Sequence, residues 1–445
     1  MANAVAETEA LSTDPQVARR ADLLVHIASS DAGEVQRAIK LLGGAVPGIG
    51  SSGLTAVLAY ATSTGEATSA EGRRAANQLG PDQLDAEPLD RNQPGPLQRD
   101  LDRRDWIRLQ PYPDSAQVSP LPGIPTSASY SIILKAALNL DAKVCLLLGP
   151  NLSSLSPQSV AALVAPVLAG DADLCLPVYA LSPYEGMLNT AVLYPLTRAL
   201  FGGGVRYPLG FDLAMSQRFQ QRLLAVVDRR ASPAGSFPWP ATEALFSGMK
   251  VAQAVIEARQ VPHVDGADLA SILTLVLGSL FADAEAKAAF WQRVRQSQPT
   301  GSALGNTPHS EVRAPEVSGM IESFRLGAGN LQEIWGLVMP PNTLLAVRKL
   351  ARIPAAEFRL ADALWARIVY DFLLAYRLGV IGRSHLLGAF VPLYLGWVAS
   401  YVLETAAPLS TPGRLEQRIE ALAEAFESEK PYIVARWRWP DRFNP

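Results

Sequence analysis

The chain has 445 residues, of which 49% are hydrophobic and 18% are charged, against a charged share of roughly 25% in typical globular proteins. A chain this long and this apolar can bury a sizeable core, which excludes a mainly disordered protein and a small disulfide-held one. Lys and Arg number 39 and Asp and Glu 42, so the net charge is −3. This balance provides no basic field for nucleic acid or for an anionic membrane.

The cysteines and the N-terminal residues bear on the compartment. Cys145 and Cys175 each lie in a short apolar run, which predicts free buried thiols and excludes a disulfide scaffold. Residues 1–20 form a polar tail in which no basic stretch precedes an apolar one, so a secretory signal is not expected. These features favour a cytoplasmic protein.

The first elements in chain order predict a parallel sheet. Leu23 to Ile27 has the composition of a short buried strand, and residues 31–42 have helical spacing that Gly43-Gly44 should end. Leu54 to Tyr60 predicts a second strand. A strand, a helix and a strand in succession indicate an α/β fold with a mainly parallel sheet.

Residues 62–125 differ from their surroundings. They are rich in Thr, Ser, Gly, Pro, Asp and Arg, and they cannot bury much surface. We interpret them as a disordered or mobile insertion, within which residues 106–113 could form one short strand.

The pattern then returns to alternating helices and strands. A helix is expected over residues 131–140, followed by a strand at Val144 to Leu148. Ser156 is placed to cap a further helix that has Pro157 at its first position. Residues 172–179 predict another strand.

The pattern beyond about residue 240 is helical. The clearest helical segments are residues 241–258, 267–294, 361–378 and 412–429. We therefore divide the chain into a polar tail (1–20), an α/β domain (21–265) and a mostly helical C-terminal region (266–445).

One segment of the helical region tests whether the protein is soluble. Leu386 to Leu403 contains 18 residues without a charge, which is the lower limit for a membrane span. The segment is interrupted by Gly388, Pro392 and Gly396. A buried helix pair is the preferred interpretation and a membrane-associated segment is the alternative. No transmembrane helix is expected.

Common catalytic motifs are missing from the sequence. Gly48, Gly50 and Gly53 match G-x-G-x-x-G, but here a helix precedes and a strand follows, the reverse of a dinucleotide-binding loop. A flexible connection is the better interpretation. There is no H-E-x-x-H, C-x-x-C, G-x-S-x-G or phosphate-binding G-x-x-x-x-G-K-[ST] sequence.

The most informative region is residues 171–216. It contains YPLTRALFG at 194–202, followed by Arg206 and by PLG at 208–210. With VYDF at 369–372, VPLY at 391–394 and RWRWP at 436–440, the chain resembles bacterial GT-A glycosyltransferases of the mannosylglycerate synthase and glucosyl-3-phosphoglycerate synthase type. The resemblance covers most of the chain outside residues 62–125. It implies a GT-A domain and descent from nucleotide-sugar hexosyltransferases.

The resemblance also implies a metal site that this chain has altered. Relatives hold Mg²⁺ or Mn²⁺ on the sugar-nucleotide diphosphate with an Asp-x-Asp motif just past a strand end, where open α/β sheets bind ligands. The corresponding residues here are Gly149-Pro150-Asn151, so Asn151 keeps one oxygen ligand and no carboxylate remains. No cofactor is certain, and Mg²⁺ or Mn²⁺ is expected only if the altered site still binds metal.

Other positions of the family pattern are also changed. The nucleotide-contacting turn of relatives is Ala28-Ser29-Ser30-Asp31 here, an acidic base-reading position is replaced by Ala61-Thr62-Ser63, and a Gly-Lys-Gly turn by Gly123-Ile124-Pro125. A downstream acid is replaced by Phe237. The carboxylate of a Gly-Gly-[Asp/Glu]-Phe-Gly turn survives as Asp212. These five changes and survivals are assigned through the resemblance alone.

Two functional hypotheses follow for the residues that remain. In the enzyme hypothesis, Asp212 is catalytic and Arg198 and Arg206 bind the phosphates of a nucleotide sugar, without the ordinary metal. His263 is a weak candidate metal ligand, or else an ordinary loop histidine. In the other hypothesis the chain is a non-catalytic scaffold or binding protein, Asp212 is a structural partner of Arg206, and the arginines pair with nearby acids or cap helices. We favour loss of ordinary metal-dependent activity. The donor, the acceptor, the oligomeric state and any protein partner stay open.

Overall fold

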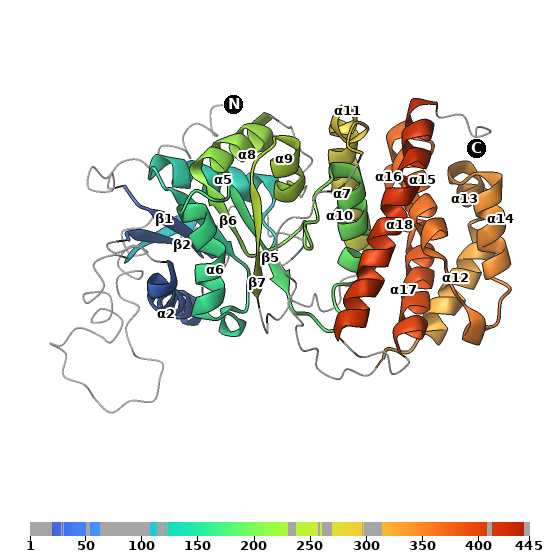
Figure 1. The fold of residues 1–445 in the computed structure, drawn as a ribbon, viewed down its shortest axis with the longest axis horizontal. Helices are drawn as coiled ribbons and strands as arrows, with labels where there is room; N and C mark the ends of the chain where they lie inside the picture. Colours follow the sequence, from blue (N-terminus) through green and yellow to red (C-terminus); the bar gives the residue numbers. More distant parts are fainter. Residues whose placement is uncertain are drawn as a thin grey trace.

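A computed structural model shows an α/β sheet domain beside a helical C-terminal region (Figure 1). The structure describes residues 20–27, 29, 31–49, 54–62, 107–113, 121, 123–229, 237–256, 259, 269–295, 297, 314–406 and 412–439.

The described part of the sheet domain is built on seven strands in the order β3-β2-β1-β4-β6-β5-β7. The pairs β1–β2, β1–β4, β2–β3 and β5–β7 are parallel, whereas β6 runs antiparallel to both β4 and β5. The fold class is therefore α/β with a mostly parallel mixed sheet. The strands are β1 Leu23–Ile27, β2 Ala56–Thr62, β3 Ile107–Pro113, β4 Val144–Leu148, β5 Leu174–Tyr179, β6 Leu213–Ser216 and β7 Val251–Ile256.

Helices cover both faces of this sheet. Side chains alternate along β1, so Leu23 and Val25 pack in one apolar cluster with α2 and α6, while Leu24 packs in another with α5, α8 and α9. Both faces are buried, which explains why β4 is apolar throughout and β1 is apolar except for the buried His26. The helices are α2 Ala32–Ile49, α5 Ser127–Asn139, α6 Pro157–Leu168, α8 Gln217–Arg229 and α9 Pro240–Phe246.

The helical region has its own core, which contains the buried indole rings of Trp291, Trp335, Trp365 and Trp397. Figure 1 shows α7 beside α18, although α7 comes from the middle of the sheet domain in the sequence. The elements are η2 Asn189–Leu193, α7 Tyr194–Phe201, α10 Leu269–Ala286, α11 Ala288–Trp291, α12 Ser318–Asn330, α13 Gln332–Val338, α14 Pro341–Leu350, η3 Ala355–Glu357, α15 Asp362–Leu378, α16 Arg383–Gly388, α17 Val391–Thr405 and α18 Pro412–Arg438.

The prediction that Gly43-Gly44 ends the first helix is wrong, because α2 continues to Ile49. The glycines of this helix serve packing instead. A Cβ atom on Gly44 would lie 2.8 Å from Pro157, and one on Gly48 would lie 2.9 Å from Ala161, both on α6. The two helices approach so closely that only glycine fits at these points. Gly48 therefore belongs to a helix, and the rest of the G-x-G-x-x-G sequence lies outside the described residues.

The predicted helix over residues 241–258 is also wrong. The chain forms α9, turns, and enters β7, which pairs in parallel with β5. Gly248 in the turn has a φ of +65°, a conformation that favours glycine and ends the helix. The apolar run that follows fits both the helical and the strand periodicity of apolar residues, and pairing with β5 decides that it is a strand.

The polar insertion and the apolar segment give two further outcomes. The predicted strand inside residues 62–125 exists as β3, at the sheet edge, and most of the remaining insertion lies outside the described residues. The segment 386–403 is a helix pair, α16 and α17, whose most apolar window is 72% buried. α10 is also long and apolar enough to cross a membrane, but core helices pass the same test.

Candidate functional site

The strand order places a topological switch point between β1 and β4. The chain moves outward from β1 to β2 and β3, and then returns to add β4 on the other side of β1. In open α/β sheets, ligands bind at the carboxyl ends of the strands beside such a switch point. Gly149 and Asn151 follow β4 at this edge, and Asp212 reaches the same edge because it precedes the antiparallel β6.

Asp212 is fully buried at this edge and is held by four donors. The Gly149 N–H donates to Oδ1 at 2.9 Å, and the Tyr179 hydroxyl donates to Oδ2 at 3.1 Å. The guanidinium of Arg259 adds Nε to Oδ2 at 2.9 Å and Nη2 to Oδ1 at 3.1 Å. This parallel pairing is the strongest arrangement for an arginine and a carboxylate.

Arg259 follows β7 and joins three loops through one buried side chain. Its Nη1 donates to the Asn151 carbonyl at 2.7 Å and to the Ser154 hydroxyl at 2.9 Å. Its Cζ lies 5.1 Å from the centre of the Phe211 ring. Counting the two bonds to Asp212, four of the five N–H groups of this guanidinium are used. The side chains of Arg259 and Asp212 are both 0% exposed, so little of this cation remains for a ligand.

Tyr179 and Phe211 complete the wall around Asp212. The two rings stack at a centroid distance of 4.8 Å, and the Tyr179 hydroxyl accepts the backbone N–H groups of Phe211 and Asp212. Burial raises the pKa of Tyr179 well above its ordinary value, with the Asp212 charge adding to the effect and Arg259 opposing it. The phenol therefore stays neutral and keeps donating to the carboxylate.

The geometry leaves no room for any side chain at the position of Gly149. A Cβ atom on Gly149 would lie 2.3 Å from Cδ2 of Phe211, far inside any real contact. Gly123 also packs tightly against the same turn, since a Cβ on it would lie 2.4 Å from Pro150. Within the described ranges, no group of three or more His, Cys, Asp or Glu residues could hold a metal ion.

The start of α2, which follows β1 at the same switch point, carries carboxylates. Asp31 caps α2 by accepting the N–H of Glu34 at 2.9 Å, and Glu34 accepts the N–H of Leu152 at 3.2 Å. Glu34 also pairs with Arg37 at 2.8 Å. The positive end of a helix dipole commonly binds phosphate, but here two carboxylates of the chain lie at that position.

The arginines predicted to bind phosphate lie elsewhere, on the seam with α18. Arg198 pairs with Glu420 and with Glu427, the latter at 2.9 Å. Arg206 lies 3.5 Å from Glu416 and over the ring of Tyr194. The structural partner suggested for Asp212 was Arg206, and the observed partner is Arg259.

The remaining predicted residues have mixed positions. Asn151 reaches the site through its backbone carbonyl, at a residue with a φ of +61°. Phe237 is buried in the core of the helical region. His263 lies outside the described residues. Sequence reasoning missed Arg259, because it belongs to no motif and lies 47 residues from Asp212.

Comparisons with known proteins add little to this geometry. No protein-family model and no curated protein matches the chain. A solved structure described as the crystal structure of a mycobacterial protein matches 60% of this chain and 75% of its own, with 16% sequence identity and a TM-score of 0.32. A TM-score this low does not establish a shared fold.

Proposed function

We propose that this chain is a glycosyltransferase-like protein with a GT-A-type domain, descended from nucleotide-sugar hexosyltransferases, that has little or no ordinary metal-dependent transfer activity. Its role would then be that of a scaffold or binding protein. The observation that carries the proposal is the closed pairing of Arg259 with Asp212 at the ligand-binding edge of the sheet.

Arg259 supports the proposal because it puts a fixed positive charge beside the surviving carboxylate. A divalent cation on a diphosphate needs free carboxylate oxygens, and both oxygens of Asp212 already accept hydrogen bonds from the chain. A metal would have to displace a buried guanidinium to reach Asp212. Removing one partner of such a pair is costly, at about 3–5 kcal/mol.

The competing function is metal-independent hexosyl transfer to a small acceptor. It requires cations that grip phosphate near Asp212, and the arrangement of the three arginines argues against this. Arg259 has one uncommitted N–H group, while Arg198 and Arg206 pair with glutamates of α18. Four of the five N–H groups of Arg259 are therefore unavailable to a phosphate, and Arg198 and Arg206 are engaged at the seam with α18.

Calorimetry with UDP and GDP, each with and without Mn²⁺, tests the proposal. We expect Mn²⁺ to leave nucleotide affinity unchanged. A tenfold gain, worth about 1.4 kcal/mol, would overturn it. A turnover assay with UDP-, GDP- and ADP-sugars and with glycerate, 3-phosphoglycerate or water as acceptor addresses the competing function. Metal-free turnover that Asp212→Asn abolishes at unchanged stability would establish that function instead.

A further inference from the structure

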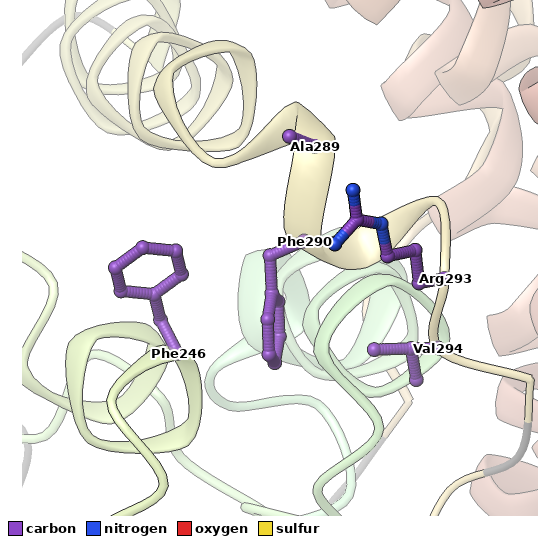
Figure 2. Close-up of a pocket in the computed structure, with 5 residues that line it drawn as sticks. All are labelled: Phe246, Ala289, Phe290, Arg293 and Val294. Carbon is purple, nitrogen blue, oxygen red and sulfur yellow. The ribbon is translucent and has the colours of Figure 1, made fainter.

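A second region of interest is an apolar pocket on the seam between the sheet domain and the helical region. It is a hollow of about 540 Å³ that is open to solvent on one side. Figure 2 shows its lining: Phe246 from the end of α9, Ala289 and Phe290 from α11, and Arg293 and Val294 from the turn that follows. Four of these five residues are apolar, and the fifth carries a positive charge.

The pocket lies beyond the amino-terminal end of β7, whereas the Asp212 site lies at the carboxyl-terminal ends of the parallel strands. Phe246 comes shortly before β7 begins at Val251, whereas Arg259 comes after β7 ends at Ile256. A strand of this length spans about 20 Å at roughly 3.3 Å per residue. A ligand in this pocket would therefore be independent of the Asp212 site and of the function proposed for it.

The aromatic rings of the pocket lie over a buried ionic network. The ring centres of Phe246 and Phe290 are 5.4 Å apart, and Lys287 Nζ lies 5.8 Å from the Phe246 ring. Lys287 pairs with Glu243 at 3.1 Å and with Asp283 at 2.9 Å. Arg222 also pairs with Glu243, at 2.7 Å. Two cations and two carboxylates balance, so the network itself leaves no net charge.

The charge of Arg293 is therefore additional to a balanced network. Arg293 is exposed at the pocket wall. An apolar surface beside an exposed arginine is complementary to a molecule that has an apolar body and an anionic end.

We propose that this pocket binds a small amphiphilic carboxylate, a fatty or aryl-alkanoic acid, with its apolar body on Phe246, Phe290 and Val294 and its carboxylate on Arg293. Planar guanidinium donors match a carboxylate in a way that a neutral or cationic head group cannot. Because α9 belongs to the sheet domain and α11 to the helical region, the ligand would contact both parts of the molecule.

Decanoate is the probe, titrated into the full chain by calorimetry at neutral pH, with decanol as the uncharged match. We expect a dissociation constant of about 2 mM for decanoate, given about 0.3 kcal/mol for each of its heavy atoms, the efficiency of an ordinary ligand. Decanol should bind about tenfold more weakly, because it lacks the charged hydrogen bond.

Three variants locate the site. Arg293→Gln should weaken decanoate about tenfold and leave decanol unchanged. Ala289→Glu should abolish binding of decanoate, since it places bulk and a like charge in the pocket from an exposed position. Arg352→Gln, which changes an exposed arginine after α14, should leave both affinities within twofold. Thermal melts check that each variant is folded.

Each opposing result overturns the proposal. Absence of saturable decanoate binding at millimolar concentration would show that the pocket does not take this ligand class. Equal affinity for decanoate and decanol would show that Arg293 does not bind the carboxylate. Binding that survives Ala289→Glu in a folded protein would place the ligand elsewhere.

Discussion

Two buried carboxylate–arginine pairs, one in each part of the molecule, differ in how completely they are satisfied. Asp212 accepts four hydrogen bonds on two oxygens, and Arg259 uses two of its three remaining N–H groups on a neighbouring loop. Asp371 on α15 accepts from Arg436 and Tyr432 of α18 through Oδ1 alone. Its Oδ2 and the Nε of Arg436 are buried without a partner.

The difference shows what each pair does for the protein. Burial raises the pKa of Asp371 to about 7, although Arg436 and Tyr432 oppose the shift. The pairing of Asp371 therefore depends on pH, whereas the complete pairing of Asp212 fixes the loops at the edge of the sheet. A buried pair stabilises one structure when every donor and acceptor is used, and it becomes a titrating group when some are not.

The largest expected effect comes from removing Arg259. Arg259→Ala leaves a buried, uncompensated carboxylate and should lower the free energy of unfolding by about 3–5 kcal/mol, measured by urea denaturation. Asp212→Asn should also destabilise, because it disrupts the same pair. The control is Arg367→Ala, which breaks the half-exposed pair with Glu429 and should cost less than about 1 kcal/mol. Equal effects of Arg259→Ala and Arg367→Ala would mean that the Asp212 pair is no stronger than a surface pair.

The second prediction concerns pH. The folded-state pKa of Asp371 is about 7, above the unfolded value of about 3.9. Its contribution to stability is therefore complete below about pH 4 and is lost as pH rises through 7, by up to about 1.4 kcal/mol per pH unit. Asp371→Asn removes this titration.

Urea denaturation of the wild type and of Asp371→Asn at pH 5, 6, 7 and 8 measures the effect. The stability difference between the two proteins should shift in favour of the variant as pH rises, and it should level off above pH 7. A difference that does not change with pH would show that Asp371 is ionised throughout, with Arg436 compensating its burial.

The smallest expected losses of stability come from removing the hydroxyl groups of the two tyrosines that donate to these carboxylates. Tyr179→Phe removes one donor to Asp212 and the acceptor of two backbone N–H groups, so we expect a loss of about 2 kcal/mol. Tyr432→Phe removes one hydrogen bond to Asp371 and should cost about 1 kcal/mol. Thermal melts of both variants at pH 6 give the comparison. A larger loss of stability for Tyr432→Phe would contradict the conclusion that Asp212 is the more completely hydrogen-bonded of the two carboxylates.

Local signals in the sequence predicted several elements closely. β1 and β4 have the predicted bounds, because strands buried on both faces are nearly continuous apolar runs. Ser156 caps α6 with Pro157 at its first position, as expected, since a cap is a contact between near neighbours. Both cysteines are free and buried.

Elements that depend on distant partners were missed or misassigned. β6 has four residues and owes its existence to pairing with β4 and β5. β7 was assigned to a helix, because its apolar run fits either periodicity until β5 lies beside it. The glycines of α2 were taken as a helix end, because only the approach of α6 shows why they are small.

The same division holds for the candidate site. The sequence by itself determined that Gly149-Pro150-Asn151 contains no carboxylate and that residue 212 is an aspartate, because these are facts of residue identity. Only the tertiary structure decided that Arg259 neutralises Asp212, that Phe211 occupies the space beside Gly149, and that Arg198 and Arg206 serve the seam with α18. Pairing between buried charges is settled by which loops the sheet brings together, and that distance in space has no counterpart in sequence spacing.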